Sequence, residues 1–220
     1  MSSVLQMVCL ANSRKGGDRC VAGMEFGSKK WVRPISRRPN EAVSVTERQY
    51  SDRSEPRILD IVTMGLIEKR PSKFQRENWL IDPTVQWVKV GQIDWDGLCG
   101  LEQQPEELWI NGYSSWGRLN NKIPASRQGE IASSLALIRV ESVTIGADGF
   151  ARFEHMGHDY VINLTDPAYE EMFKAKGVLR KKLGESFITV SLGKEWDDGY
   201  LYKFVAAIIE RSEIESDGRR

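Results

Sequence analysis

Histidine and cysteine are scarce in this chain of 220 residues, which contains two histidines and three cysteines. Cys9, Cys20 and Cys99 lack the paired spacing of a zinc site, and so few cysteines are typical of a reduced, cytoplasmic protein. A zinc site or a histidine-dependent triad would need His155 and His158, which flank a predicted hairpin turn and are expected to be exposed to solvent. We therefore expect no metal and no other cofactor.

Long apolar runs are also missing. None approaches the roughly 18 residues needed to span a bilayer, so no membrane partner is expected. The first segment, MSSVLQMVCLANSRK, lacks a basic region before its short apolar run and lacks a cleavage signature. We interpret it as a first strand rather than a signal peptide. The glycines match neither the ATPase loop GxxxxGK(S/T) nor the dinucleotide fingerprint GxGxxG, which argues against both chemistries.

Local positive charge is the most informative feature of a chain whose net charge is zero. Residues 13–48 contain nine Lys/Arg and four Asp/Glu, and glycines lie among the first of these basic residues. Arginine and lysine donate hydrogen bonds to phosphate, and glycines let backbone N–H groups approach an anion. The segment therefore indicates a phosphate-bearing partner.

The C-terminal half has the clearer pattern of secondary structure, because apolar and polar side chains alternate as they do in half-buried strands. The expected strands are residues 135–145, 150–155, 159–164, 187–192 and 200–209. Between the third and the fourth, Thr165, Asp166 and Pro167 are typical of a helix start, and the helix should stop at Gly177. Three strands, a helix and two strands are the element order of an OB fold, a small five-stranded barrel.

The N-terminal half repeats this order without repeating the sequence. Its expected strands are residues 4–10, 19–24, 31–35, 59–68 and 85–90. A short helix at residues 45–50 would lie between the third and fourth strands. We therefore predict a mainly β fold with two tandem OB-like five-stranded β-barrels, each with a short helical segment between strands three and four. A single larger mixed β-sandwich is the alternative.

The composition divides this fold into four segments. We predict a first OB-like barrel at 1–93, an inter-barrel linker with loops and a short helix at 94–130, a second OB-like barrel at 131–212, and a flexible polar tail at 213–220. The linker begins in an acidic stretch, because residues 92–110 contain five carboxylates and no basic residue. Its second part is rich in turn residues and should form a loop.

The basic residues of the first barrel are expected to share one face. In an OB barrel the ligand-facing side includes the loop between strands one and two, here residues 12–18, and the third strand. Asn78 and Trp79, placed in the loop between strands four and five, would close the same groove. The predicted residues that bind nucleic acid or nucleotide are Ser13, Arg14, Lys15, Gly16, Gly17, Arg19, Trp31, Arg33, Arg37, Arg38, Asn78 and Trp79.

Each of these residue types has a physical role in such a site. The arginines and lysine would neutralise phosphates, the glycines would admit the backbone, and a tryptophan would stack on a base, an interaction worth about 1–3 kcal/mol. The alternative is that the basic loop is only solvated and that Trp31 and Trp79 pack in a core.

No catalytic residue is predicted. Asp166 is explained as a helix cap, and Glu170 and Glu171 as first-turn acids that suit the helix dipole. Cys20 follows Arg19, whose charge favours a thiolate, but no base lies close to it in the sequence. An active site would require groups that converge only in the folded chain.

Several segments together resemble the bacterial dual OB-fold domain family. They are ANSRKGGDRCVAG, WVRPIS, LDIV, ENWLID, WVKVG, LW-NGYSS, TDPAYE, TVSLG and YKFVAAII, and the resemblance extends from about Val4 to Ile209. The resemblance implies two barrels, in agreement with the element order. It also implies a small cytoplasmic protein of bacterial genomes, associated with genome-conflict and defence systems, and it supplies no catalytic residues.

Three functions follow in order of preference. The first is a non-catalytic binding module for a short single strand of nucleic acid or a nucleotide, through the basic face of the first barrel. The second is a protein-interaction or scaffold module that docks a protein partner through the linker, around Trp95, Trp109 and Trp116. The third and least favoured is an enzyme that acts on nucleotides or RNA.

Overall fold

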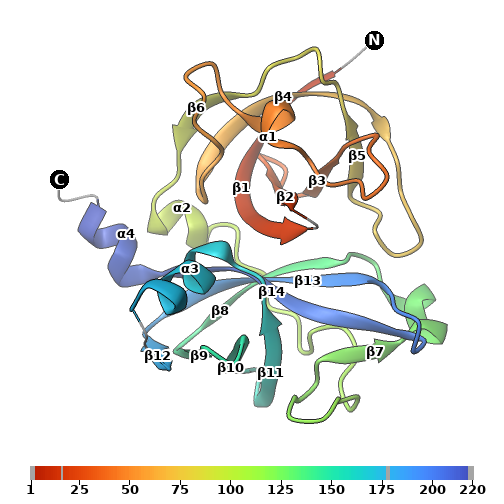
Figure 1. Ribbon diagram of the computed structural model, residues 1–220, viewed down its shortest axis with the longest axis vertical. Coiled ribbons are helices and arrows are strands. Elements are labelled where there is room, and N and C mark those ends of the chain that lie inside the picture. Colours follow the sequence, from red (N-terminus) through yellow and green to blue (C-terminus); the bar gives the residue numbers. More distant parts are fainter. Residues whose placement is uncertain (1–2, 16, 177–178, 218–220) are drawn as a thin grey trace. The chain divides into compact units, whose positions relative to one another are not determined.

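The structure, a computed structural model, describes residues 3–15, 17–176 and 179–217, and it divides the chain into two compact units, Met1–Leu101 and Glu102–Arg220. Both units consist mainly of β-strands, with a few short helices (Figure 1). Each has its own cluster of buried apolar side chains. Within the described ranges, no helix has both the length and the apolar character needed to cross a membrane.

The first unit contains a closed five-stranded barrel. The strands of the unit are β1 (Ser3–Lys15), β2 (Asp18–Glu25), β3 (Trp31–Ile35), β4 (Asp60–Lys69), β5 (Asn78–Ile81) and β6 (Val88–Gln92), of which β1 to β5 form the barrel. Neighbours follow the order β1-β2-β3-β5-β4, and β4 pairs with β1 again, which closes the barrel. The β3–β5 pair is parallel, and the other pairs are antiparallel. This arrangement confirms the predicted OB topology.

The fifth barrel strand is not the one predicted. It is β5, whereas the predicted strand at 85–90 corresponds to β6, which pairs with the first half of β4 while β5 pairs with the second half. β5 has four residues and begins with a polar side chain, so its period-two pattern is too short to detect. β6 alternates more clearly in sequence, yet most of its side chains are exposed.

The long first strand β1 closes this barrel because it pairs with two neighbours. Its first half, residues 3–8, pairs with β4, and residues 7–15 pair with β2. A register shift between Cys9 and Ala11 marks a bulge, which increases the local twist of a strand. The core contains Met7, Cys9, Val21, Val32, Val43, Tyr50, Val62, Met64, Leu66, Ile81 and Trp87.

A short helix, α1 (Val45–Arg48), lies between β3 and β4, as predicted. The Glu47 carboxylate accepts hydrogen bonds from the Ser44 backbone N–H at 2.8 Å and the Ser44 hydroxyl at 2.6 Å, which caps the helix. At its other end, the buried Arg48 forms an ion pair with Glu55 at 2.6 Å and donates to the Val43 carbonyl oxygen.

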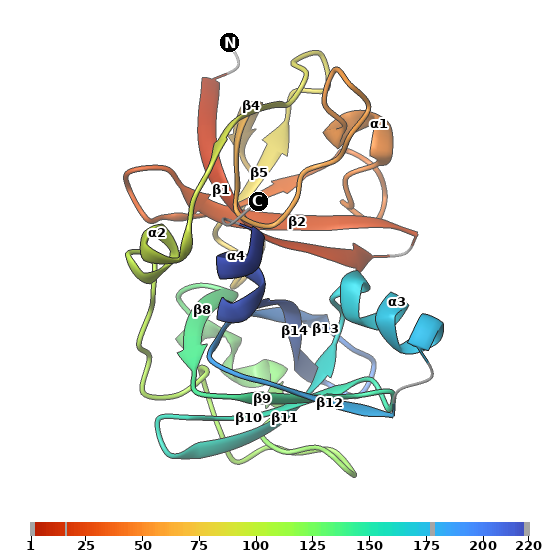
Figure 2. The same ribbon diagram turned by 90° about the vertical axis from the view of Figure 1, so that its left-hand side faces the viewer.

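The second unit follows the same plan. Its strands are β7 (Lys122–Pro124), β8 (Leu135–Val140), β9 (Val143–Gly146), β10 (Phe150–His155), β11 (His158–Leu164), β12 (Arg180–Leu183), β13 (Ser186–Glu195) and β14 (Tyr200–Glu210). The order is β12-β9-β10-β11-β14-β13-β8, with β11 and β14 parallel (Figure 2). β8 and β9 follow each other in the sequence, as do β12 and β13, and β9 pairs with β12 as β8 pairs with β13. If each of these two segments is counted as one strand, the sheet is a second OB barrel whose first and fourth strands are each divided in two.

The division of the first strand has a clear consequence for pairing. The predicted strand at 135–145 breaks at Glu141 and Ser142, so β8 pairs with β13 while β9 pairs with β10 and β12. The core of this unit contains Ile138, Val143, Ile145, Ala151, Phe153, Tyr160, Ile162, Ile188, Val190 and Val205 among others. A bent first strand therefore lets one segment line two sides of the barrel.

The helix α3 (Pro167–Lys176) confirms the predicted start. Asp166 accepts hydrogen bonds from the backbone N–H groups of Ala168 at 3.0 Å and Ile208 at 3.1 Å, so it ties the helix start to β14. Gly177, the predicted stop, lies outside the described residues.

The segment predicted as a linker is divided between the two units. The helix α2 (Trp95–Cys99) belongs to the first unit, and β7 with the 3-10 helix η1 (Ala125–Glu130) belongs to the second. At the C-terminus, the helix α4 (Arg211–Asp217) occupies most of the segment expected as a flexible tail.

The cap of α2 provides a test of the local structure. Asp94 accepts a hydrogen bond from the Gly97 N–H at 2.8 Å. We expect Asp94→Ala to lower the free energy of unfolding by about 1 kcal/mol, and Asp94→Asn to retain most of it, because asparagine caps nearly as well. Urea unfolding followed by tryptophan fluorescence measures both. Equal midpoints for the two variants would contradict the role of this cap.

Candidate functional site

The β1–β2 hairpin carries most of the predicted basic residues. Ser13, Arg14 and Lys15 lie in β1, and Asp18 opens β2, with Lys15 paired to Asp18 in the ladder. The predicted loop at 12–18 is therefore wrong, because the strands continue almost to the turn. As a result, the ladder fixes the backbone positions of these basic residues.

The small residues around this turn have structural roles. Gly17 has φ +87°, a left-handed backbone conformation that glycine adopts without strain. Gly16 lies outside the described residues. Ser13 is buried, and its hydroxyl donates to the Cys20 carbonyl oxygen at 3.5 Å, so it does not present its side chain to a ligand.

Two arginines are directly opposite each other in the hairpin. Arg14 pairs with Arg19 in the antiparallel ladder, so their side chains project from the same face. Arg14 is exposed and Arg19 is half-buried. Within the described part of the chain, the Nη1 atom of Arg19 is buried without a hydrogen-bond partner. Opposed like charges repel, and a buried donor without an acceptor is costly, so this face suits an anion.

The segment after β3 adds a further cation to the hairpin. Arg37 and Arg38 are both exposed, and Arg38 forms an ion pair with Asp18 at 2.7 Å. The backbone of Arg19 also exchanges two hydrogen bonds with Val43, at 3.3 and 2.9 Å. The hairpin and this segment therefore lie side by side, as the prediction of a shared basic face requires.

An acidic residue limits the charge of this surface. Burial raises the pKa of Glu47, whereas hydrogen bonds from Ser36 and Ser44 and the charge of Arg38 lower it. The lowering effects together exceed the effect of burial, so the pKa of Glu47 is below its ordinary value. Glu47 therefore carries a negative charge close to Arg38. Together with Asp18 it reduces the net positive charge of this surface, so the surface can neutralise only a few phosphates.

Arg33 does not belong to the exposed surface. It is 4% exposed, and its Nη2 atom lies 3.5 Å from the Glu77 carboxylate, which is equally buried. Its backbone N–H donates to the Glu77 carbonyl oxygen at 2.9 Å. The prediction that Arg33 faces a ligand is wrong, because its side chain is buried beside the Glu77 carboxylate.

Trp31, Asn78 and Trp79 are also removed from solvent to differing extents. Trp31 is 9% exposed and Asn78 is fully buried in the sheet. Trp79 packs against the first core, with Lys69 Nζ 5.3 Å from its ring centroid. The prediction that Asn78 and Trp79 lie in the loop between strands four and five is wrong, because both belong to the short strand β5.

The second unit contains a buried lysine, Lys203, that the sequence analysis does not predict as a functional residue. Lys203 is 1% exposed, and its Nζ donates to the Ile110 carbonyl oxygen at 2.9 Å and to Asn111 Oδ1 at 3.1 Å. Burial lowers the pKa of Lys203 to about 7, although the charge of Glu107 opposes this shift. Its ammonium group therefore holds the 107–112 segment against the barrel.

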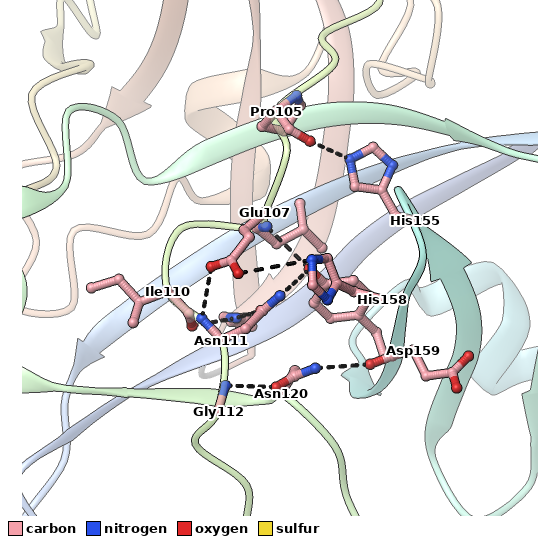
Figure 3. A network of polar contacts seen from close by, with 12 residues as sticks. Pro105, Glu107, Ile110, Asn111, Gly112, Asn120, His155, His158 and Asp159 are labelled. Carbon is pink, nitrogen blue, oxygen red and sulfur yellow. Dashed lines mark hydrogen bonds and ion pairs between the residues drawn. The ribbon is translucent and has the colours of Figure 1, made fainter.

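The amide side chains of Asn111 and Asn120 continue this network (Figure 3). The Tyr160 hydroxyl accepts hydrogen bonds from the Leu108 N–H at 3.2 Å and the Asn111 side chain at 2.9 Å. Asn120 accepts from the Gly112 N–H at 2.8 Å. The turn-rich segment predicted as a loop is thus attached to the barrel by specific contacts.

The two histidines have different environments. His155 is 5% exposed on the inward side of β10, and its Nε2 lies 2.7 Å from the Pro105 carbonyl oxygen, so the prediction that it is exposed is wrong. Burial lowers its pKa despite that hydrogen bond. His158 is half-buried, with Nε2 3.8 Å from the Glu107 carboxylate.

Clusters of metal-ligating side chains and the environment of the Cys9 thiol complete the description of the site. In the described part of the chain, no group of three His, Cys, Asp or Glu side chains is close enough to hold a metal ion. Burial and the nearby Asp60 raise the pKa of the Cys9 thiol to about 12, so it is a poor nucleophile.

Comparison with known proteins supports the topology of both units. The family model described as the dual OB-containing domain matches residues 5–208. The matched span covers nearly the whole chain and confirms the resemblance found in the sequence. No curated protein matches the chain, and no solved structure does.

Proposed function

We propose, from the premise that this chain belongs to the dual OB-containing domain family, that its first barrel binds a short single strand of nucleic acid or a nucleotide. The family and the fold make the chain a binding module in general terms. The class of ligand and the surface that binds it are our proposal. A role in genome-conflict and defence systems stays a prediction from the resemblance.

The opposed pair Arg14 and Arg19 carries this proposal. The ladder places two guanidinium groups on one face of the hairpin, and one of them retains a buried donor without an acceptor among the described residues. A phosphate between them would relieve the repulsion and satisfy that donor, since guanidinium groups bind phosphate in a charge-assisted, bidentate geometry. Lys15, Arg37 and Arg38 extend the same positive region.

The size of this region favours a small ligand. Asp18 and Glu47 compensate part of the positive charge, and the whole chain has no net charge. A protein that binds long duplex DNA usually presents a strongly basic stripe. A nucleotide or a strand of a few nucleotides requires only two or three phosphate contacts, which the hairpin supplies.

The test is a fluorescence anisotropy titration of a labelled ten-nucleotide single strand, with free nucleotides as competitors, at two salt concentrations. Arg14→Ala with Arg19→Ala should weaken binding at least about tenfold, or about 1.4 kcal/mol. The variant should also reduce the slope of log K against log salt by about 0.7, since the pair is proposed to hold one phosphate and each phosphate contact on a single strand contributes about 0.7.

The matched control is Arg53→Ala with Arg76→Ala, which removes two exposed cations from the same unit but away from the hairpin ladder. This control should bind as the wild type does. The proposal fails if the wild type does not bind, or if the hairpin variant and the control bind equally well.

A protein-interaction module remains the second candidate, on the strength of Trp116. This residue is 97% exposed, whereas Trp95 is 7% exposed and Trp109 packs against the second core, with its indole N–H bonded to the Ser133 carbonyl oxygen. An exposed tryptophan is a typical interface anchor. Loss of a partner on Trp116→Ala, with nucleic-acid binding unchanged, would favour this function. An enzyme stays the least favoured.

A further inference from the structure

The outer face of β10, β11 and β14 in the second barrel has an unusual concentration of aromatic side chains. Phe150, Asn163 and Phe204 are successive partners across these three strands, so they form one row. Phe150 and Phe204 are half-buried. A Cβ atom at Gly193 of β13 would lie 2.7 Å from the Phe204 ring, so this glycine leaves the space that the ring occupies.

Two further aromatic residues extend this row toward the connection between β13 and β14. Tyr202 lies on the same side of β14 as Phe204, and its ring centroid is 5.4 Å from that of Trp196 in an edge-on contact. The Tyr202 hydroxyl donates to the Asp198 carboxylate at 2.6 Å, which fixes the ring. Trp196 is 59% exposed, so a large ring face is accessible to a ligand.

Two cations from the 113–124 segment lie against this aromatic face. The Arg118 guanidinium is 4.6 Å from the Phe150 ring centroid and is held by a hydrogen bond from its Nε to Asn163 Oδ1 at 2.8 Å. Lys122 Nζ is 3.7 Å from the Tyr200 ring centroid. Within the described residues neither cation has a carboxylate partner, so each retains charge for an anion.

The attachment of that segment explains why these cations are well placed. Leu119 forms a bridge to Val161 of β11, and β7 pairs with β14 at residues 200–202. The segment therefore fills the space between β11 and β14, which pair directly only at Asn163 and Leu164. The turn-rich sequence that was predicted as a loop contributes to the surface of the barrel.

We propose that this face is a second binding site, for single-stranded nucleic acid, in which Trp196 and Tyr202 stack on bases while Arg118 and Lys122 contact phosphates. Aromatic rings interspersed with cations that have no carboxylate partner in the described part of the chain match the alternation of bases and phosphates in a single strand. The site lies entirely in the second unit and does not depend on the proposed function of the first barrel.

Acidic side chains near this face determine whether base stacking or phosphate contacts contribute more to the affinity. Asp198 is bonded to Tyr202, and Asp148 neutralises the nearby Arg152 at hydrogen-bond distance. Because carboxylates repel phosphates, few phosphate contacts form and stacking contributes most of the affinity. We expect binding at this face to depend less steeply on salt than binding at the β1–β2 hairpin.

The test combines two variants of the full chain with a single-stranded oligonucleotide that contains photoreactive bromouracil. Trp196→Ala with Arg118→Ala should weaken binding at least about tenfold in a background that carries Arg14→Ala and Arg19→Ala. Photocrosslinks to that background should map to peptides with Trp196 or Tyr202. The matched control, Phe26→Ala with Arg127→Ala, removes an exposed aromatic and an exposed cation elsewhere.

Several results would overturn this inference and would be separate from a failure at the hairpin. The first is equal affinity of the Trp196–Arg118 variant and the control. The second is the absence of crosslinks to this face while the hairpin binds. The third is concentration-dependent self-association that Trp196→Ala abolishes, which would assign the face to a second copy of the chain. Near-ultraviolet circular dichroism verifies that each variant is folded.

Discussion

Replacing Glu77 with alanine should lower the free energy of unfolding of the first barrel by about 3–5 kcal/mol, because it leaves a buried charge without its partner. Arg33 and Glu77 have side chains that are 5% and 4% exposed. Arg33 Nε already lacks a hydrogen-bond partner among the described residues, so the carboxylate is its main compensation. Urea unfolding of the full chain, followed by tryptophan fluorescence, measures the loss.

The double variant Arg33→Met with Glu77→Leu is the informative control. Replacing both members of a buried ion pair by apolar side chains is often neutral or stabilising, so this variant should unfold close to the wild type. It should also bind oligonucleotide as the wild type does, because Arg33 is structural and not part of the hairpin surface. Unchanged stability of Glu77→Ala would show instead that water reaches the Arg33 guanidinium.

The second large effect is a dependence of stability on pH that originates in Lys203. Its pKa is lowered to about 7 in the folded chain from 10.5, the ordinary value for lysine. Below pH 7 the amine is charged in both states, so the cost of burying the charge is fully present. Between pH 7 and 10.5 the folded state is neutral and the unfolded state is charged, so folding releases a proton and stability rises with pH.

The expected rise is about 1.4 kcal/mol per pH unit in that window, with a plateau on either side. The quantity to measure is the free energy of unfolding of the wild type minus that of Lys203→Met, from pH 6 to pH 11. Lys203→Arg should be destabilised throughout and should show no rise, because a guanidinium stays charged. A difference that does not change with pH would mean that Lys203 is solvated in the folded chain.

Much of the fold could be predicted where strands are long and lie on one side of a core. Residues 150–155 and 159–164 alternate cleanly, and the Asp166 cap with Pro167 marks the helix start. In contrast, β5 and β12 have four residues each, too few to establish a period. Their places are determined by the partners they pair with, which are distant in the sequence.

The candidate site was less predictable than the fold, and Arg33 and Lys203 show why. A charged residue in a strand is expected to face solvent, yet both are buried by segments that are remote or poorly patterned in the sequence. For Lys203 a signal exists, because Leu201, Lys203 and Val205 alternate with aromatic residues and lie on the inward side of β14. Arg33 has no such signal, since every residue of β3 is buried.

The parallel contacts β3–β5 and β11–β14 also have a consequence for folding during synthesis. Each barrel closes only when its fifth strand is available, and such non-local pairing slows folding. In the first unit that strand ends at Ile81, whereas in the second it is β14, which ends at Glu210. We therefore expect the first barrel to fold while the second is still being translated, and the second to fold only after β14 has left the ribosome.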